Sequence, residues 1–314
     1  MSVVNAFQVW EVDERLVESP SVTNRNLFAQ KLKDEDPDTI LRRWHNFGLQ
    51  AIDDFYGNVF DLLPEVRLSG VGLELGAGTG GFSSVICKRF ADIRSIYAVE
   101  VVADVVRLLQ PKTMAGICGE RVGKIERVIG SFDALELDAA SVDFCVEIDS
   151  LHHSDDLGAT LKEVARVMKQ GGVLVILDRS HNNKLSEEQT KFMLDVVYSE
   201  EWKKEHGFDL ARLTRRENGE HELRLGDWED ALREAGFVVD KRLELRAVTL
   251  QKLLRGLMLS LPFRLRKRLK LLPSRVRPQE GELLWMLAYL MGKGRASRLY
   301  QPFLRDYTLF IARR

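Results

Sequence analysis

The sequence has few cysteines, no long apolar run and almost no net charge. Its three cysteines, Cys87, Cys118 and Cys145, form no C-x-x-C pair, so we expect reduced thiols in or near the core rather than a zinc site or a disulfide framework. The longest apolar run spans only residues 283–291, well short of the roughly 20 residues of a membrane helix. The first residues lack the pattern of a secretory signal. We therefore predict a cytoplasmic protein.

The composition is that of an ordinary globular protein. A formal net charge of −1 over 314 residues gives the whole chain no steering field, and the length allows one enlarged domain or two small ones. Apolar periodicity predicts an α/β fold. The predicted segments are a helical segment at 1–65, a core at 66–248 that contains an insert at 179–222, a basic helical insert at 249–305 and a last core strand at 306–314.

The glycine-rich loop that follows residue 75 is the most informative part of the chain. An apolar run at 71–75 leads into glycines at 76, 78, 80 and 81, and residues 82–90 have the pattern of an amphipathic helix. A strand, a glycine turn and a helix expose backbone N–H groups that a nucleotide-like ligand can approach closely. A second predicted strand at 94–100 ends in Glu100, which is well placed to accept hydrogen bonds from both hydroxyls of a ribose.

The segment Glu74-Leu-Gly-Ala-Gly-Thr-Gly80 resembles motif I of the class I S-adenosylmethionine-dependent methyltransferases. The likeness continues through Leu-His-His at 151–153 and the run from Glu163 to Asp178, and it is similar to the group that includes ubiquinone-pathway and sugar O-methyltransferases. The resemblance implies a doubly wound, Rossmann-like sheet of seven strands whose last strand is antiparallel. It also implies S-adenosylmethionine (SAM) as the cofactor.

The resemblance further implies a set of cofactor-binding residues. Glu74 would orient the loop or the methionine amine, and Glu100 would hold the ribose. Ser131 stands where the family often has an aspartate that receives the adenine amino group, so Ser131 or Phe132 would make that contact. The full set is Glu74, Gly76, Gly78, Gly80, Glu100, Ser131, Phe132 and Glu147.

The catalytic candidates gather after the predicted strands at 142–147 and 173–178, where open α/β sheets place their ligands. Methyl transfer to a hydroxyl requires that the oxygen be aligned and its proton removed, and histidine suits the proton because its pKa lies near neutral pH. In the sugar O-methyltransferases that this region resembles, such positions supply the base and its partner. The candidates are Glu147, Asp149, His152, His153, Asp178 and His181, with His221 entering from the insert.

Two alternatives stay open for these histidines. The Leu-His-His triplet also occurs in relatives that methylate carbon, where a histidine only packs, and His221 fits a surface loop equally well. One of His152 and His153, supported by Asp178, is the predicted base. No His-Glu-x-x-His spacing is present, and we predict no metal site.

The predicted function is O-methylation of a sugar or similar hydroxyl in a bacterial glycan or natural-product pathway. The alternatives are carbon or nitrogen methylation of a lipid-like or aromatic small molecule, and a non-catalytic scaffold with the same fold. Nucleic acid is not an expected partner, because the residues after Glu147 lack the Pro-Pro motif usual in enzymes that methylate base amines.

Three segments outside the core bear on the acceptor. Residues 1–65 would fold over the cofactor mouth or only pack against the sheet edge, and the aromatic residues of 179–222 suit a lid or a helical core. Residues 249–305 carry 13 Lys and Arg but two acids, interleaved with apolar residues. That pattern favours an anionic membrane surface or a lipid-linked acceptor, with the protein peripheral at the inner membrane face. Internal packing or an oligomer interface is the alternative.

Overall fold

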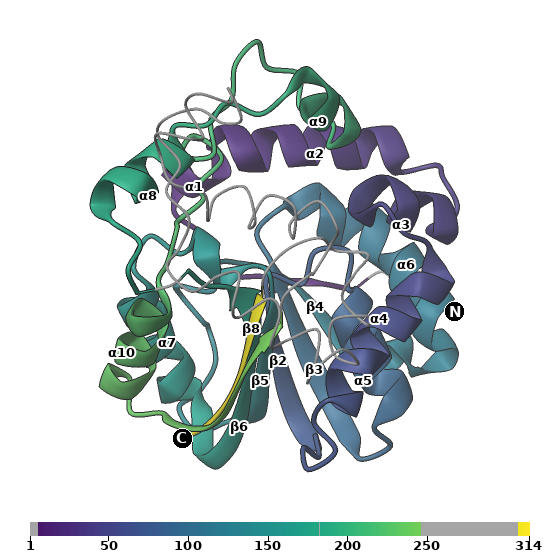
Figure 1. Ribbon diagram of the computed structural model, residues 1–314. Helices are drawn as coiled ribbons and strands as arrows, with labels where there is room; N and C mark the ends of the chain where they lie inside the picture. Colours follow the sequence, from purple (N-terminus) through teal and green to yellow (C-terminus); the bar gives the residue numbers. More distant parts are fainter. Residues whose placement is uncertain (1–5, 182, 246–306) are drawn as a thin grey trace, which may run out of the picture.

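A single mixed sheet organises the computed structural model, which describes residues 6–181, 183–245 and 307–314 (Figure 1). Its eight strands run in the order β1-β4-β3-β2-β5-β6-β8-β7. Strands β1 to β6 pair in parallel, and β8 lies antiparallel between β6 and β7. The strands are β1 (Gln8–Val9), β2 (Gly70–Leu75), β3 (Ile93–Glu100), β4 (Ile125–Ile129), β5 (Val142–Ile148), β6 (Met168–Arg179), β7 (Val238–Leu245) and β8 (Tyr307–Arg313).

The order of these strands reverses between β2 and β5. Strands β3 and β4 lie on one side of β2, whereas β5 and β6 lie on the other. Open α/β sheets bind ligands at such a switch point, outside the carboxyl ends of the strands. The segments that follow β2 and β5 therefore meet where a ligand is expected.

Helices cover both faces of the sheet, as a doubly wound fold requires (Figure 1). The face under α4, α5 and α6 packs around Phe60 and Phe82, whose rings stack with centroids 5.4 Å apart. The face under α7 and α10 packs around Trp228. The helices are α1 (Glu14–Val17), α2 (Pro20–Leu32), α3 (Pro37–His45), α4 (Leu49–Asp61), α5 (Gly81–Arg89), η1 (Val105–Leu109), α6 (Gln110–Cys118), η2 (Gly119–Lys124), η3 (Leu151–His153), α7 (Leu157–Val167), α8 (Glu187–Leu194), α9 (Glu200–Glu205) and α10 (Leu225–Glu234).

The doubly wound α/β class and the final antiparallel strand are confirmed, but the expectation of seven strands is wrong. The additional strand is β1, a two-residue strand that pairs in parallel with β4 at the sheet edge. The backbone N–H of Trp10 continues this pairing to the carbonyl of Ile129 at 2.9 Å. Two residues are too few to show an alternating apolar pattern, so periodicity does not reveal this strand.

The segments outside the core meet above the carboxyl ends of the strands. In Figure 1, α2 crosses this end of the molecule with α9 beside it. The backbone N–H of Asp209 donates to the Asn24 side chain at 3.4 Å, and the backbone N–H of Asp104 donates to the Asn26 side chain at 2.8 Å. The first contact joins α2 to residues that follow α9, and the second joins it to the chain after β3.

All three cysteines are free and buried, as expected. Within the described ranges, no helix has the length and apolar character needed to cross a membrane. The predicted basic insert at 249–305 lies outside the described residues.

Candidate active site

The loop of residues 76–80, called the glycine loop below, joins β2 to α5. Gly78 adopts a φ of +51°, and a Cβ placed there would meet no atom of the described residues within 4 Å, so these residues leave room for a ligand beside the loop backbone. The other face is held in place: Gly78 donates its N–H to Glu100 at 2.8 Å and accepts from the Gln110 amide at 2.8 Å. From the N-terminal helices, His45 contacts the hydroxyl of Thr79 at 2.9 Å.

Two buried carboxyl groups support the glycine loop. Glu74 is bound by the backbone N–H of Ser83 at 3.0 Å and by the Ser83 hydroxyl, and burial raises the pKa of Glu74 to about 8. Glu100 accepts from the backbone N–H of Gly78 and from that of Val102 at 2.9 Å, and burial raises its pKa as well. Backbone and hydroxyl donors therefore orient both groups.

The predicted adenine contacts lie at the end of β4. Ser131 is buried, and its hydroxyl pairs with Asp133, whose N–H and carboxylate each lie 3.2 Å from it. The exposed Asp133 is also bound by the Thr160 hydroxyl. Phe132 packs partly against the core on this side of the sheet. The adenine role of Ser131 and Phe132 stays a prediction.

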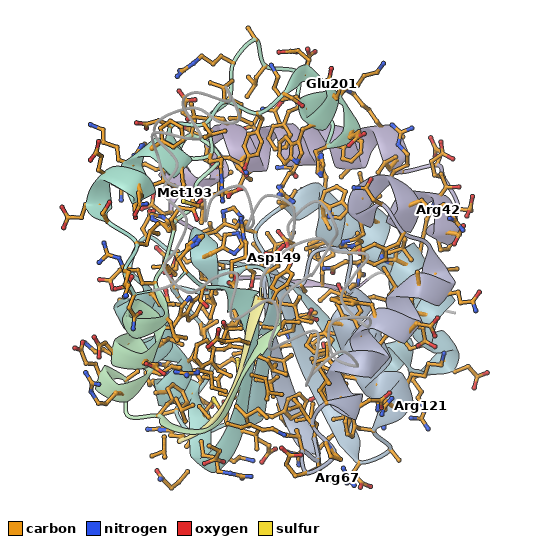
Figure 2. The ribbon with its side chains drawn as sticks, in the orientation of Figure 1. Arg42, Arg67, Arg121, Asp149, Met193 and Glu201 are labelled. Carbon is orange, nitrogen blue, oxygen red and sulfur yellow. The ribbon has the colours of Figure 1, made fainter. Side chains whose placement is uncertain are left out.

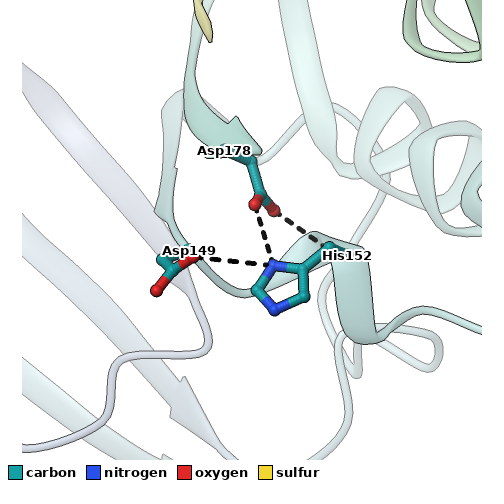
Figure 3. A group of neighbouring side chains, drawn as sticks. All are labelled: Asp149, His152 and Asp178. Atoms are coloured by element: carbon teal, nitrogen blue, oxygen red, sulfur yellow. Dashed lines mark hydrogen bonds and ion pairs between the residues drawn. The ribbon is translucent and has the colours of Figure 1, made fainter. Parts of the chain in front are cut away.

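Beyond β5, the η3 turn brings His152 against Asp178 at the end of β6 (Figure 3). His152 Nδ1 lies 2.8 Å from Asp178 Oδ1, and the His152 backbone N–H donates to Oδ2 at 2.9 Å. Both side chains are buried, at 1% and 0% exposed. Burial raises the pKa of Asp178 to about 6, against the opposing charge of Arg179. Because Asp178 accepts at Nδ1, neutral His152 keeps its basic lone pair on Nε2.

Arg179 links this pair to Asp149 and Glu220. Its Nε lies 3.1 Å from Asp149 Oδ1, its Nη1 lies 2.9 Å from Glu220 Oε2, and its Nη2 contacts His152 Nε2. Asp149 has a φ of +53°, an uncommon conformation for a non-glycine residue that recurs at functional sites. Figure 2 shows Asp149 near the centre of the molecule.

Glu220 joins the 179–222 segment to the histidines. It accepts from the Tyr198 hydroxyl and from Arg215 at 2.7 Å, and Arg215 also pairs with Glu222, which contacts His181. Burial alone would raise the pKa of Glu220, but the guanidinium groups of Arg179 and Arg215 hold it well below its usual range. We call the following residues the arginine cluster: Asp149, His152, Asp178, Arg179, Arg215, Glu220 and Glu222.

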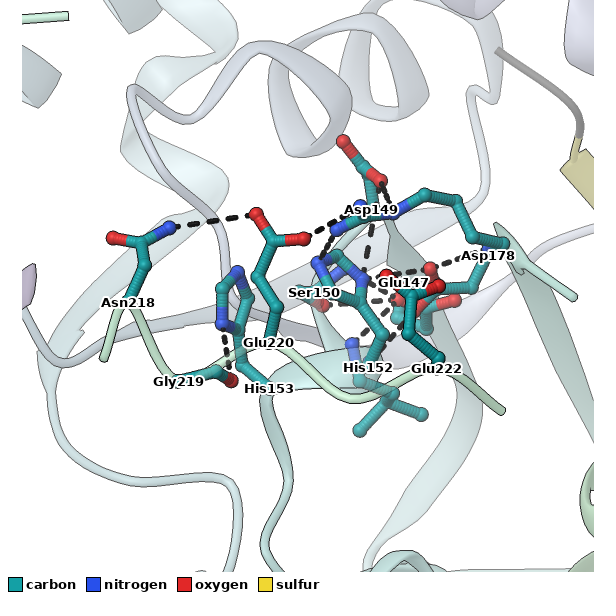
Figure 4. Close-up of polar contacts among 12 residues, drawn as sticks. Glu147, Asp149, Ser150, His152, His153, Asp178, Asn218, Gly219, Glu220 and Glu222 are labelled. Atoms are coloured by element: carbon teal, nitrogen blue, oxygen red, sulfur yellow. Dashed lines mark hydrogen bonds and ion pairs between the residues drawn. The ribbon is translucent and has the colours of Figure 1, made fainter. Parts of the chain in front are cut away.

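Two further predicted histidines, His153 and His221, differ in where their rings lie. His153 donates from Nδ1 to the Gly219 carbonyl at 2.9 Å (Figure 4), and burial, with the charges of His152 and Arg25, lowers its pKa to about 3. The backbone N–H of His221 donates to the His152 carbonyl at 2.9 Å. Its ring, however, pairs with the exposed Asp155 at 3.2 Å. The structure thus brings His152, His153 and Asp178 together and directs the His221 ring to the surface.

Glu147 lies beneath the histidine turn and is fully buried. It accepts from the Ser150 hydroxyl at 2.9 Å and from the backbone N–H groups of Ser150 and Leu151 at 3.2 Å. Burial and the nearby Asp178 carboxylate raise its pKa well above the usual range. Its side chain therefore supports the turn that carries the histidines.

Sequence reasoning missed the residues that connect the segments. Arg179 directly follows Asp178, so its place at the end of a predicted strand could have indicated a role in the site. Glu220 and Tyr198 lie far from the strand ends in sequence, and nothing in their local pattern marks them.

Asp149, His152 and Asp178 each offer a ligand atom, and these atoms lie within 4.8 Å of one another. Such a set has the donor types that a divalent cation accepts. The Arg179 guanidinium already contacts Asp149 and His152, so positive charge is present there. The absence of a metal stays a prediction.

Comparison with known proteins agrees with this arrangement. Residues 73–176 match the family model described as a methyltransferase domain. Proteins named uncharacterized methyltransferases from Mycobacterium tuberculosis and Mycobacterium bovis are 29% identical over 113 residues, which is 36% of this chain. The matched part of this chain spans 41% of the length of those relatives.

Two solved structures share the fold. One comes from Galdieria sulphuraria, and its assignment as a sarcosine dimethylglycine methyltransferase is provisional. Its TM-score is 0.51 and its sequence identity is 18%, and the match covers 83% of this chain and 84% of the Galdieria chain. The other is a geranyl diphosphate C-methyltransferase from Streptomyces coelicolor, with a TM-score of 0.50 and 14% sequence identity. That match covers 82% of this chain and 80% of the Streptomyces chain.

The family match and the common fold agree with the glycine loop and with the acid at the end of β3. Together they indicate a methyltransferase domain of the class I S-adenosylmethionine-dependent type over residues 73–176.

Proposed function

We propose that this chain transfers the methyl group of SAM to a hydroxyl of a small-molecule acceptor, with His152 as the base. The observation that carries the proposal is the buried pair of His152 and Asp178, which stands after β5 beside the glycine loop that follows β2. A fixed imidazole with one basic nitrogen is what deprotonation of a hydroxyl requires.

The residues present fit the cofactor. The open face of Gly78 allows close approach to the loop backbone, and Glu100 lies at the loop to accept from ribose hydroxyls. Glu74 accepts from the Ser83 N–H and so ties the start of α5 to β2, and Glu100 accepts from two backbone N–H groups at the loop. When bound, the cofactor supplies an activated methyl group on a sulfonium.

The protein's own task is then to align the acceptor oxygen and to remove its proton. Asp178 fixes the His152 ring through Nδ1 and stabilises the imidazolium that forms. In the described conformation, Arg179 contacts Nε2, so the acceptor hydroxyl would take the place of this guanidinium. Glu220 and Asp149 would keep Arg179 close by as it moves.

A sugar or similar hydroxyl in a bacterial glycan or natural product is the acceptor class we propose. A base at this position suits a hydroxyl, whose proton must leave as the oxygen is methylated. The test is incubation of the purified chain with SAM and a panel of sugar, phenol, amine and carbon acceptors, followed by mass spectrometry of the products. We expect an O-methyl product that the His152→Ala variant forms far more slowly. A product methylated on carbon, or full turnover by the variant, would overturn the proposal.

We also propose that the acceptor is linked to lipid at an anionic membrane surface. The support is the charge of residues 249–305, with 13 basic and two acidic side chains, since each basic group near such a surface contributes about 1 kcal/mol. Co-sedimentation with anionic vesicles should exceed that with neutral vesicles at low salt. Equal binding would leave internal packing or an oligomer interface as the role of this segment.

A further inference from the structure

Arg25 is a cation on the inward face of α2. The buried residues of this helix include Val22, Phe28, Ala29 and Leu32. Arg25 precedes Phe28 by three residues and Ala29 by four, so it shares their face of the helix. That face packs against η1, which follows Glu100 closely in the chain. Arg25 is therefore directed toward the end of the sheet where the candidate site lies.

The surroundings of Arg25 fix its position but leave its charge without a carboxylate. Its Cζ lies 5.9 Å from the ring centroid of Trp44, which itself stacks on Phe28. Among the residues that the structure describes, the Arg25 guanidinium forms no ion pair. Arg179 and Arg215 differ, because buried or half-buried carboxylates pair with both.

The packing of Arg25 leads to the glycine loop: Trp44, over which its guanidinium lies, directly precedes His45, whose ring contacts the Thr79 hydroxyl. Its charge contributes to the lowered pKa of His45, which contacts the glycine loop, and to that of His153. The same charge opposes the rise that burial causes in the pKa of Glu100. These effects agree with the direction that the packing of α2 gives Arg25, toward the glycine loop and the chain after β3.

We propose that Arg25 binds an anionic group of the acceptor, either a carboxylate or a phosphate. The inference rests on the proposed function, because the cofactor carries a net positive charge. An unpaired guanidinium near such a cofactor is unfavourable unless an anion accompanies it. An anionic acceptor supplies that charge and forms charge-assisted hydrogen bonds with the guanidinium.

The test uses the full chain saturated with S-adenosylhomocysteine, titrated calorimetrically with pyrophosphate and, separately, with inorganic phosphate. We expect Arg25→Gln to weaken anion binding about 10-fold to 100-fold and Arg25→Lys to retain part of it. Lys31→Gln removes the same charge from an exposed position on the same helix and should bind the anion as the wild type does.

Three outcomes would overturn this inference. They are equal anion binding by Arg25→Gln and wild type, no anion binding by the wild type, and a loss of S-adenosylhomocysteine binding in Arg25→Gln. The last would assign Arg25 to the carboxylate of the cofactor instead. Normal binding of S-adenosylhomocysteine by the wild type would in every case leave the proposed function standing, and its absence would contradict that function separately.

Discussion

The glycine loop and the arginine cluster are the two halves of the candidate site, and their buried carboxyl groups have different partners. At the glycine loop, Glu74 and Glu100 accept from backbone and hydroxyl groups, and burial raises both pKa values. In the arginine cluster, Glu220 is paired with Arg179 and Arg215, and its pKa falls. Among the described residues, no cationic side chain pairs with the two carboxyl groups of the first half, whereas the second half contains its own cations.

This difference separates binding of the cofactor from reaction of the acceptor. A change in the arginine cluster should affect turnover or folding and leave the cofactor in place. A change at the glycine loop should affect the cofactor first. Substitutions in one half therefore test whether the other half is affected.

The largest expected effect follows loss of the base. His152→Ala should lower turnover about 10²-fold to 10⁴-fold, because no base then removes the proton of the substrate hydroxyl. Asp178→Asn should also lower turnover, since it removes the charge that fixes the ring and stabilises the imidazolium. Both would be measured by product formation at saturating SAM. If both variants keep full turnover, and His153→Ala does not, the base is His153.

The next effect concerns folding stability. Arg179→Met leaves the nearly buried Glu220 without one of its cations, and breaking a buried pair costs about 3–5 kcal/mol. The double variant Arg179→Met/Glu220→Gln should recover part of this loss in urea unfolding. Arg233→Met, which breaks an exposed pair with Asp230, should change stability little. If Arg179→Met and Arg233→Met lower the free energy of unfolding equally, the ion pairs of the arginine cluster do not stabilise the fold.

A smaller effect is expected in the pH dependence of stability. Burial raises the pKa of Glu74 from 4.5 to about 8, so the folded state retains a proton that the unfolded state has lost. The retained proton stabilises the folded state fully below pH 4.5, the unfolded pKa. This stabilisation is lost as the pH rises from 4.5 to about 8, by up to about 1.4 kcal/mol per pH unit. Glu74→Gln, which cannot ionise, should show a flatter profile in urea unfolding between about pH 5 and 8. Identical slopes would contradict the assigned protonation.

No effect is expected from metal removal. Arg179 supplies positive charge beside Asp149 and His152, so dialysis against EDTA should leave turnover unchanged. Loss of turnover with EDTA that Mg²⁺ or Mn²⁺ restores would instead assign a metal to Asp149, His152 and Asp178.

The glycine-loop half was largely predictable because its signals are local. The apolar run, the glycines and the amphipathic helix that become β2, the loop and α5 are consecutive in sequence, and Glu100 ends the next strand. The alternating residues also predicted the strand β8, and the family resemblance predicted its antiparallel direction, although its pairing with β6 and β7 bridges distant parts of the chain.

The arginine cluster was only half predictable, because long-range ion pairs complete it. The sequence indicated His152 and Asp178 by their place after strands. The partner of Arg179, Glu220, lies 41 residues away in sequence, and no periodic pattern relates the two. The His221 ring turns to Asp155, a choice of side-chain direction that spacing does not determine. Arg25 lies in a helix without any motif, and only the packing of α2 shows which way it faces.

Calorimetric titration of S-adenosylhomocysteine into the wild type, Glu100→Ala and His152→Ala tests the separation of the two halves most directly. Glu100→Ala should weaken binding by about 1–3 kcal/mol, because the ribose hydroxyls lose a charged partner, while His152→Ala should bind as the wild type does. Unchanged affinity in Glu100→Ala, or an equal loss in both variants, would contradict the account.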